Sequence, residues 1–288
     1  MNAIKREYGE GVEIISRRPV SGGEISSAYE LELSNGIRVF LKLNNESKAD
    51  LFRAEEEGLS AMRETKRVSV PRVIARGRDE AGVFLLMEQI EAGRAGRESS
   101  ERLGRELALM HMADSTKFVP GGKYGFTSDN YIGEIAQINT PKEKWADFFA
   151  ECRLLPQIEL ASHYFSTEDM QKFDTLLAKL DEYLPEPEMP SLLHGDLWSG
   201  NYLIDINGKP WLIDPAAYVG HAEADLAMTE LFGGFDNYFY GAYRETAGID
   251  KGYAERRDLY NLYNLINHLN HFGTGYLGAV IKTLKKYT

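Results

Sequence analysis

The sequence predicts a two-lobed α+β fold, with a small N-terminal antiparallel β-sheet lobe containing one main helix and a larger, mostly helical C-terminal lobe. Short segments of alternating apolar residues, separated by Gly-rich or Asn-Gly turns, dominate the first 90 residues. Longer segments with an apolar residue every three or four positions dominate the rest. At 288 residues the chain can bury two cores. We therefore expect lobes at 1–90 and 91–288.

Three strands are predicted near the N-terminus, at residues 12–18, 28–33 and 37–43. The first two are joined by a loop rich in glycine and serine, which includes Gly22, Gly23 and Ser26. Glycines in such a loop can present backbone N–H groups to phosphate oxygens, because no Cβ stands in the way. A plain turn is the alternative, since the loop lacks the G-x-G-x-x-G spacing.

A helix is predicted at 51–62, with Leu51, Glu55 and Leu59 spaced four apart on one face. Glu55 is therefore an acidic residue on the inward face, and a buried carboxylate is costly unless it is paired. Lys42, on the preceding strand, is its natural partner. Spacing alone does not decide between this pair and a Glu55 that reaches solvent beside an ordinary strand lysine.

The remaining elements follow from periodicity and from breaks in it. Pro71 interrupts the chain, residues 82–88 are predicted to be a buried strand, and 89–100 are predicted to be a linker. Segment 114–141 is rich in Gly and Asn, and we expect a surface loop over a site there. Long helices are predicted at 102–112, 145–160, 168–183 and 255–272.

The stretch from 191 to 218 places several chemically useful side chains around a predicted hairpin. A short apolar strand leads into His194-Gly195-Asp196, and the Asn207-Gly208 pair predicts a two-residue turn. Counting outward from this turn sets Asn201 opposite Asp214, with Cβ atoms about 4.5–5.5 Å apart. Their oxygens suit Mg²⁺ that is also held by substrate phosphates. These features predict the catalytic centre of a phosphotransferase. The alternative is that Asn201 and Asp214 only form local turn hydrogen bonds, as lone Asn and Asp residues at hairpin ends commonly do.

Composition limits the partners and the compartment. The net charge is −11, from 44 acidic and 33 basic residues, which argues against a nucleic-acid partner. An anionic substrate would then need local cations and a metal. We expect no signal peptide and no membrane span, because no apolar run approaches about 18 residues. The single cysteine, Cys152, predicts a buried helix residue and fits a reducing compartment, so we expect a cytoplasmic protein.

These parts together resemble the protein-kinase set: a strand lysine, a helix glutamate, an H-x-D-L-x-x-x-N loop and a later aspartate. More narrowly, HGDLWSGN (194–201), DPAAYVGHAEADLAM (214–228) and FGGF (232–235) resemble the fructosamine/ketosamine-3-kinase family, which is related to aminoglycoside phosphotransferases and choline kinases. FRAEEEGL, YGFTSDNYIG and WADFFAECRLLPQ are also similar to that family. The departures are the loose glycine loop and Ala217, where a larger or Cys side chain is expected.

The resemblance implies a protein-kinase-like fold and an enzyme that uses ATP and Mg²⁺ to phosphorylate the 3-hydroxyl of ketosamines. Its substrate would be a small-molecule ketosamine or a glycated protein lysine, and loss of the phosphorylated sugar would make it a deglycation enzyme. The alternatives are a phosphotransferase for another hydroxyl, on an aminoglycoside, choline or a sugar, and a nucleotide-binding regulator without turnover. The sequence does not define the oligomeric state.

The resemblance also implies roles for individual residues. Asp196 is expected to be the catalytic base or a carboxylate that orients the attacking hydroxyl. Asn201 and Asp214 are expected to bind Mg²⁺, and Trp198 to wall the sugar unless it packs in the core. His194 and His111 are expected to be structural, and Asp225 to cap a helix and brace the catalytic loop. The nucleotide-binding set consists of the glycine-loop residues, the ion pair and a hinge that reads adenine: Gly22, Gly23, Ser26, Lys42, Glu55, Met87, Glu88 and Ile90.

Overall fold

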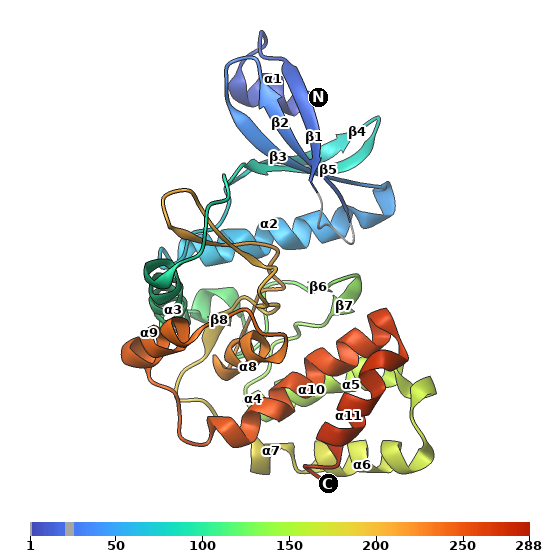
Figure 1. Ribbon diagram of the computed structural model, residues 1–288. Coiled ribbons are helices and arrows are strands. Elements are labelled where there is room, and N and C mark those ends of the chain that lie inside the picture. The colour runs from blue at the N-terminus through green and yellow to red at the C-terminus, as the bar shows by residue number, and fades with distance from the viewer. Residues whose placement is uncertain (1, 21–25) are drawn as a thin grey trace.

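The computed structural model describes residues 2–20 and 26–288, and the predicted glycine-loop residues Gly22 and Gly23 lie outside this range. An antiparallel sheet and its helices form the N-terminal part, and a mostly helical part lies below it (Figure 1). The α+β fold predicted from the sequence is confirmed. The predicted division near residue 90 stays a prediction.

The N-terminal sheet has five antiparallel strands in the order β1-β2-β3-β5-β4. Helix α2 (Ala49–Glu64) crosses the molecule directly beneath this sheet (Figure 1). The strands are β1 (Ile14–Val20), β2 (Ser27–Leu33), β3 (Arg38–Asn44), β4 (Val73–Asp79) and β5 (Gly82–Glu88).

Alternation along β5 explains how the sheet buries both faces. Leu85 and Met87 belong to the same core as Phe52 of α2, whereas Phe84 and Leu86 face the core on the opposite side. That second face is covered by α1 (Asn2–Tyr8), which the sequence analysis missed together with β4. Both are short and rich in charge, so packing against neighbours stabilises them more than their own periodicity does.

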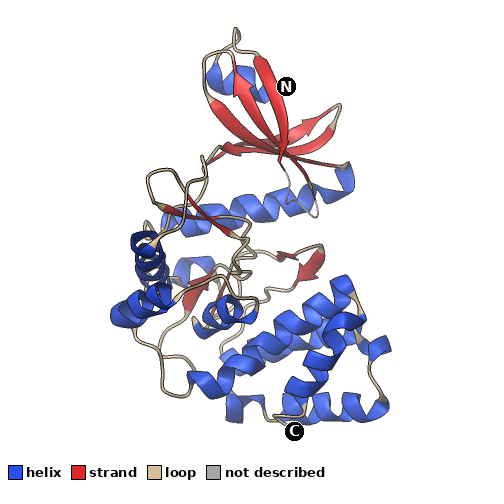
Figure 2. Cartoon of the chain, viewed as in Figure 1, coloured by secondary structure: helices blue, strands red, loops and turns tan. Residues whose placement is uncertain are grey.

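Helices make up most of the C-terminal part (Figure 2). Helix α3 begins at Arg97, so the predicted linker at 89–100 is too long. The predicted helix at 145–160 contains a π-helical turn, and the one at 168–183 is broken at Lys179. The segments are α3 (Arg97–His111), α4 (Trp145–Phe149), the π turn (Ala150–Leu154), α5 (Leu155–Leu160), α6 (Thr167–Ala178), α7 (Leu180–Tyr183), α8 (Glu223–Leu231), α9 (Asn237–Ala247), α10 (Tyr253–Phe272) and α11 (Leu277–Leu284).

The described residues also form three short antiparallel pairs of strands. They are β6 (Asn130–Ile132) with β7 (Ile135–Gln137), β8 (Ser191–Leu193) with β11 (Tyr218–Gly220), and β9 (Tyr202–Ile204) with β10 (Pro210–Leu212). The expectation of a surface loop at 114–141 is wrong, because this segment contains the β6–β7 hairpin and buries Tyr124 and Phe126.

The β9–β10 hairpin has a three-residue loop at 206–208 rather than the predicted two-residue turn. Tyr202 pairs with Leu212, and the Ile213 N–H donates to the Asn201 carbonyl at 3.0 Å. Asn201 therefore lies opposite Ile213, not opposite Asp214 as predicted. The cause is Asp205, whose carboxylate accepts the N–H groups of Asn207 at 2.8 Å and Lys209 at 2.9 Å. These bonds favour a longer loop that ends in a glycine with positive φ.

No helix in residues 2–20 and 26–288 is long and apolar enough to cross a membrane.

Candidate active site

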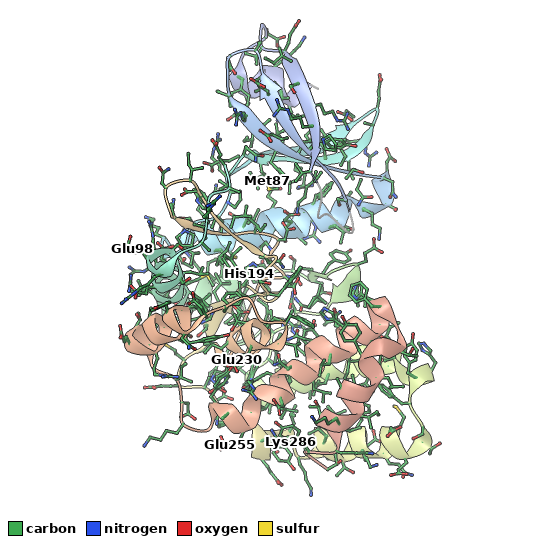
Figure 3. All side chains as sticks on the ribbon, viewed as in Figure 1. Met87, Glu98, His194, Glu230, Glu255 and Lys286 are labelled. Atoms are coloured by element: carbon green, nitrogen blue, oxygen red, sulfur yellow. The ribbon has the colours of Figure 1, made fainter. Side chains whose placement is uncertain are left out.

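The loop that carries Asp196 is held in the middle of the molecule by buried hydrogen bonds. Figure 3 shows His194 between Met87 of the sheet and Glu230 of α8. The Asp225 carboxylate accepts the N–H groups of His194 at 2.7 Å and Gly195 at 2.9 Å. Asp225 therefore braces the loop as predicted, although it lies in the first turn of α8 and not at the cap position.

The two histidines predicted to be structural are both buried and hydrogen-bonded. His194 Nε2 lies 2.8 Å from the Ile213 carbonyl oxygen, which ties the Asp196 loop to the residue just before Asp214. His111 lies between Asp225 at 3.2 Å and the Tyr243 hydroxyl at 2.8 Å. Their burial and hydrogen bonding are as predicted, and the absence of a role in proton transfer stays a prediction.

Asp196 and Asn201 are bonded to each other within this loop. The Asn201 amide nitrogen donates to the Asp196 carboxylate at 3.0 Å and to the Asp196 carbonyl at 2.8 Å. Burial raises the pKa of Asp196 to about 7, with the negative charges of Asp214 and Asp225 adding to the effect against the Asn201 hydrogen bond. A carboxyl that titrates near neutral pH can accept a proton from a hydroxyl and release it again.

Lys42 forms ion pairs with two acids from opposite sides of the site. Its ammonium lies 2.7 Å from a Glu55 carboxylate oxygen and 2.6 Å from one of Asp214. The predicted pairing of Lys42 with Glu55 is confirmed, and the alternative of a solvent-exposed Glu55 is wrong: both side chains are only 13% exposed.

The pKa values of the three groups in this cluster shift in different directions. Burial acts to lower the pKa of Lys42, yet the two carboxylates outweigh it and raise that pKa above its ordinary value. Burial raises the pKa of Glu55, whereas the Lys42 ammonium outweighs burial and lowers the pKa of Asp214. The Asp214 side chain is 46% exposed.

Asp214 has an unusual backbone conformation, with φ of +54°. A non-glycine residue in the left-handed region costs roughly 1–3 kcal/mol and persists only where its surroundings hold it. Part of this hold comes from α2, because Gly58 packs so closely that an added Cβ would lie 3.0 Å from Pro215 Cγ. The helix that carries Glu55 therefore rests directly on the residue after Asp214.

Trp198 is 41% exposed, so the alternative that it packs in the core is wrong. Its ring lies over Gly200, where an added Cβ would come within 2.3 Å of the indole. The neighbouring Ser199 touches Gly234 of the FGGF segment, whose own Cβ would lie 2.3 Å from the serine Cβ. An exposed indole thus lies two residues after Asp196, on a loop that close contacts hold in place.

The remaining predicted nucleotide-site residues lie at the ends of interior strands, Ser26 at one end of the sheet and Met87 and Glu88 at the other. Ser26 accepts a hydrogen bond from the Asn44 amide at 3.0 Å, at the end of β3. Met87 and Glu88 end β5, and Ile90 follows in the linker, with Met87 and Ile90 buried. The linker is fastened to the β9–β10 hairpin by bonds from Gly93 N–H to Ile204 O at 2.7 Å and from Ile206 N–H to Glu91 O at 3.1 Å.

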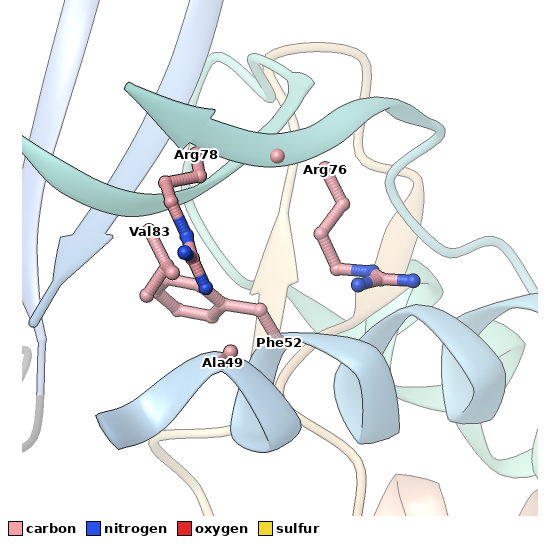
Figure 4. Close-up of a pocket in the computed structure, with 6 residues that line it drawn as sticks. Ala49, Phe52, Arg76, Arg78 and Val83 are labelled. Carbon is pink, nitrogen blue, oxygen red and sulfur yellow. The ribbon is translucent and has the colours of Figure 1, made fainter. Parts of the chain in front are cut away.

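Two small cavities lie outside the Asp196 cluster. One, of about 210 Å³, lies between α2 and strands β4 and β5 and is lined by Phe52, Arg76 and Arg78 (Figure 4). Both arginines are already paired, with Glu56 and Glu46. The other, also about 210 Å³, borders the linker at Glu88 and Ile90 and the tip of the β9–β10 hairpin.

The donors in the cluster fit a hard cation bound together with phosphate. Both hydrogen bonds of the Asn201 amide nitrogen go to Asp196. The amide oxygen is therefore the group of this side chain that can coordinate a cation. The Asp214 carboxylate supplies a second oxygen. Two protein oxygens are too few for a metal cage but match Mg²⁺ that completes its shell with phosphate and water.

The family model described as Fructosamine kinase matches residues 1–288. The chain belongs to the fructosamine kinase family. As a member of this family it is an ATP-dependent phosphotransferase. It is 39% identical over 284 residues to a probable ketoamine kinase of Synechocystis sp., covering 98% of this chain and 94% of that protein. It is 38% identical over 282 residues to a chloroplastic protein-ribulosamine 3-kinase of Arabidopsis thaliana, covering 97% and 84%.

Solved structures agree with this assignment. A protein from Haemophilus somnus described as a fructosamine-3-kinase superposes with a TM-score of 0.87 at 27% identity, covering 99% of this chain and 95% of that one. An aminoglycoside phosphotransferase, in a ternary complex with AMP-PNP and hygromycin B, superposes with a TM-score of 0.65 at 18% identity, covering 99% and 97%. At that identity the second likeness shows the fold alone, which is kinase-like.

Sequence reasoning missed two buried residues beside the site, Asn130 and Gln137. Both lie in the segment that was expected to be a surface loop, and both are less than 5% exposed. The available signal was the pattern of apolar residues around them, with Phe126 and Ile132 close by. Polar residues in such a pattern are typical of a buried hydrogen-bond network.

Proposed function

We propose that this enzyme phosphorylates the 3-hydroxyl of ketosamines, the fructosamine and ribulosamine adducts of amines or of protein lysines. The proposal is supported by one observation above all. Lys42, Glu55 and Asp214 form a single ion cluster beside the hydrogen-bonded Asp196–Asn201 pair, in a chain of the fructosamine kinase family. A relative named as a protein-ribulosamine 3-kinase supports the choice of acceptor.

Asp196 is the proposed base for the attacking hydroxyl. The hydroxyl oxygen forms a bond to the γ-phosphorus of ATP, the bond from that phosphorus to the bridging oxygen of ADP breaks, and the hydroxyl proton passes to the Asp196 carboxylate. Its pKa of about 7 means that the carboxylate form is well populated at neutral pH. The loop bonds to Asp225 keep this carboxylate in a constant position.

Asn201 and Asp214 are the proposed Mg²⁺ ligands, and the metal, when bound, neutralises charge on the transferred phosphate. Lys42 is the proposed partner of the α- and β-phosphates, oriented by Glu55. The strand pairing sets Lys42 on β3, beside β5, so its ammonium meets Asp214 from the sheet side. Asp214 reaches the same point from the helical side.

The N-terminal lobe, residues 1–90, is proposed to bind the nucleotide. Its glycine loop, with Gly22, Gly23 and Ser26, would contact phosphate through backbone N–H groups, and Met87, Glu88 and Ile90 would form the adenine hinge. The attachment of the linker to the β9–β10 hairpin supports a hinge of constant position. Trp198 is the proposed wall of the sugar site, because it follows Asp196 by two residues and its exposed indole offers a flat apolar face to a sugar ring.

The proposed outcome is deglycation, because a sugar phosphorylated at the 3-position is lost from its amine. The acceptor would be a small ketosamine or a glycated protein. A cytoplasmic location remains our prediction from the single cysteine, and three plant relatives are named as chloroplastic.

An acceptor screen tests the proposal. The enzyme is incubated with ATP, Mg²⁺ and fructosyl-lysine or ribulosyl-lysine, and ADP release and the phosphorylated product are measured. Parallel reactions use an aminoglycoside, choline and free sugars. ADP release with one of these and none with the ketosamines would contradict the proposed substrate, and nucleotide binding without turnover on any acceptor would indicate a regulator.

A further inference from the structure

A buried chain of hydrogen bonds connects α10 to the residues just after Asp214. The Tyr263 hydroxyl donates to the Gln137 side-chain oxygen at 2.7 Å. The Gln137 amide nitrogen donates to the Asn130 side-chain oxygen at 2.7 Å and to the Ala216 carbonyl at 3.1 Å. The Asn130 amide nitrogen then donates to the Ala217 carbonyl at 2.7 Å. All three side chains in the chain are at most 4% exposed.

The segment that receives these bonds needs external support. Asp214 has its φ at +54°, in the left-handed region that a non-glycine residue rarely adopts without support from its surroundings. Within three residues of Asp214, the carbonyl of Ala216 accepts a hydrogen bond from Gln137 and that of Ala217 accepts one from Asn130. The Ala216 N–H donates to the His194 carbonyl at 2.9 Å. Hydrogen bonds therefore hold both carbonyl and N–H groups of the backbone in the three residues that follow Asp214.

The Gln137 amide is fully used, and its orientation follows from its partners. Its oxygen accepts from Tyr263, so its nitrogen must face Asn130 and Ala216, and both of that nitrogen's hydrogens are engaged. A glutamate at this position can donate at most one hydrogen bond, and only when it is protonated. A network of this kind allows one arrangement, because a half-satisfied version leaves buried polar groups without partners.

The segment 128–137, which carries Asn130 and Gln137, is also hydrogen-bonded to the helix that carries Glu55. The Ser128 hydroxyl donates to the Glu57 carboxylate of α2 at 2.5 Å, and Arg53 donates to the Ser128 hydroxyl at 3.3 Å. Residues 128–137 thus contact α2, α10 and the Asp214 segment together. Displacement of this segment would move Glu55 and Asp214 relative to each other.

We infer that Asn130 and Gln137, oriented by Tyr263, are positioning residues that hold Asp214 in the conformation that binds the metal–nucleotide complex. The inference rests on the proposed role of Asp214 as a Mg²⁺ ligand, and it assigns to the β6–β7 hairpin a task in the reaction. These residues act through the Ala216 and Ala217 carbonyls and do not touch the reacting atoms.

The test compares Gln137→Glu with Gln157→Glu. Gln157 lies on α5, is equally buried at 2% exposure, and is hydrogen-bonded to Asn270 away from Asp214. The second pair is Tyr263→Phe and Tyr260→Phe, each of which removes one buried hydroxyl with little change of shape. The Tyr260 hydroxyl receives the Trp145 indole N–H at 3.1 Å and is not part of the chain to Asp214.

The readout is ADP binding by calorimetry across a Mg²⁺ titration, with a thermal melt of each variant. We expect Gln137→Glu to raise the Mg²⁺ concentration for half-maximal tightening of ADP binding by about tenfold, in line with the effect of losing a supporting residue at a metal site. Tyr263→Phe is expected to show a smaller rise in the same direction. ADP affinity without Mg²⁺ should stay within about twofold of the wild type, and the two controls should leave the Mg²⁺ dependence unchanged.

Several outcomes overturn the inference. It fails if Gln137→Glu and Gln157→Glu lower the melting temperature equally and neither changes the Mg²⁺ dependence, because the network is then only structural. If Gln137→Glu does not fold, Tyr263→Phe against Tyr260→Phe decides alone. Nucleotide binding by the wild type that ignores Mg²⁺ also overturns it. A wild type that shows Mg²⁺-dependent ADP binding but phosphorylates no ketosamine contradicts the proposed substrate only, and the variants still decide the inference.

Discussion

The replacement of Asp196 by asparagine is expected to stabilise the protein while it removes catalysis. Burial holds the pKa of Asp196 at about 7, far above its ordinary value of 3.8. The folded state therefore binds this proton more tightly than the unfolded chain does. As the pH rises from about 4 to about 7, the unfolded chain loses the proton first, and the free energy of unfolding falls.

The magnitude follows from the size of the shift. A difference of roughly three pKa units corresponds to about 4 kcal/mol at pH 8, as an upper limit. Relaxation of the site and water around a partly exposed carboxyl reduce this to about 1–3 kcal/mol. For a chain of this size each kcal/mol moves the melting temperature by roughly 2–4 °C. Asp196→Asn should therefore melt about 2–12 °C higher than the wild type at pH 8, with the gain vanishing near pH 4.

The assay is a set of thermal melts between pH 4 and pH 8.5, with turnover measured on the same samples. Asp205→Asn is the matched control, because the Asp205 carboxylate accepts N–H groups from Asn207, Lys209 and Trp211. These hydrogen bonds outweigh burial and lower the pKa of Asp205, so its contribution is present above about pH 4 and lost below it. Asp205→Asn should be less stable than the wild type by the same amount from pH 5 to pH 8.5.

The reasoning is refuted if Asp196→Asn melts below the wild type at pH 8, or if its difference from the wild type does not change with pH. Either result would mean that the buried charge costs the fold nothing. Turnover should fall by at least about 100-fold, as for the loss of a general base. Near-normal turnover would instead show that another group accepts the proton.

Three further substitutions test other parts of the site. Lys42→Met should lower kcat by about 10²–10³-fold, the cost of losing one preorganised charge at a developing transition state, and steady-state kinetics with a ketosamine would measure it; a change confined to the acceptor KM would contradict the assignment. Gly195→Ala should destabilise the fold far more than Gly36→Ala, because both glycines have φ above +80° but only the Cβ at 195 would meet the Ala216 carbonyl, at 2.0 Å; equal melting temperatures would show that the loop yields. Trp198→Ala should raise the ketosamine KM by about tenfold, as for the loss of a stacked aromatic contact, and a matching rise in the ATP KM would exclude a sugar-specific wall.

Much of the N-terminal part could be predicted because its signals are local. Strand alternation and the Asn35-Gly36 turn set Lys42 on β3, and four-residue spacing set Glu55 on the inner face of the next helix. A buried acid and a neighbouring lysine leave few other partners, so the ion pair followed from the same pattern. Short and charged elements such as α1 and β4 escaped, because neighbours and not their own periodicity hold them in place.

The hairpin at the site shows where local counting ends. The Asn-Gly pair predicts a two-residue turn, yet the carboxylate of Asp205 competes for the N–H groups of the turn and selects a longer loop. The shift of one residue moves Asn201 from Asp214 to Ile213. Asp214 still reaches the site, because its left-handed backbone turns its side chain toward Lys42.

The sequence by itself determined the identities of the reactive groups and the elements that carry them: Lys42 and Glu55 in the N-terminal part, and Asp196, Asn201 and Asp214 around one hairpin. The tertiary structure alone decided that Asp214 shares Lys42 with Glu55, and that Asn130 and Gln137 support it from a segment that looked like a loop. The physical reason is how far apart in the sequence the interacting residues lie. Periodicity and turn chemistry act over a few residues, whereas a strained carboxylate and its buried amide partners are brought together only when segments about 80 residues apart pack against each other.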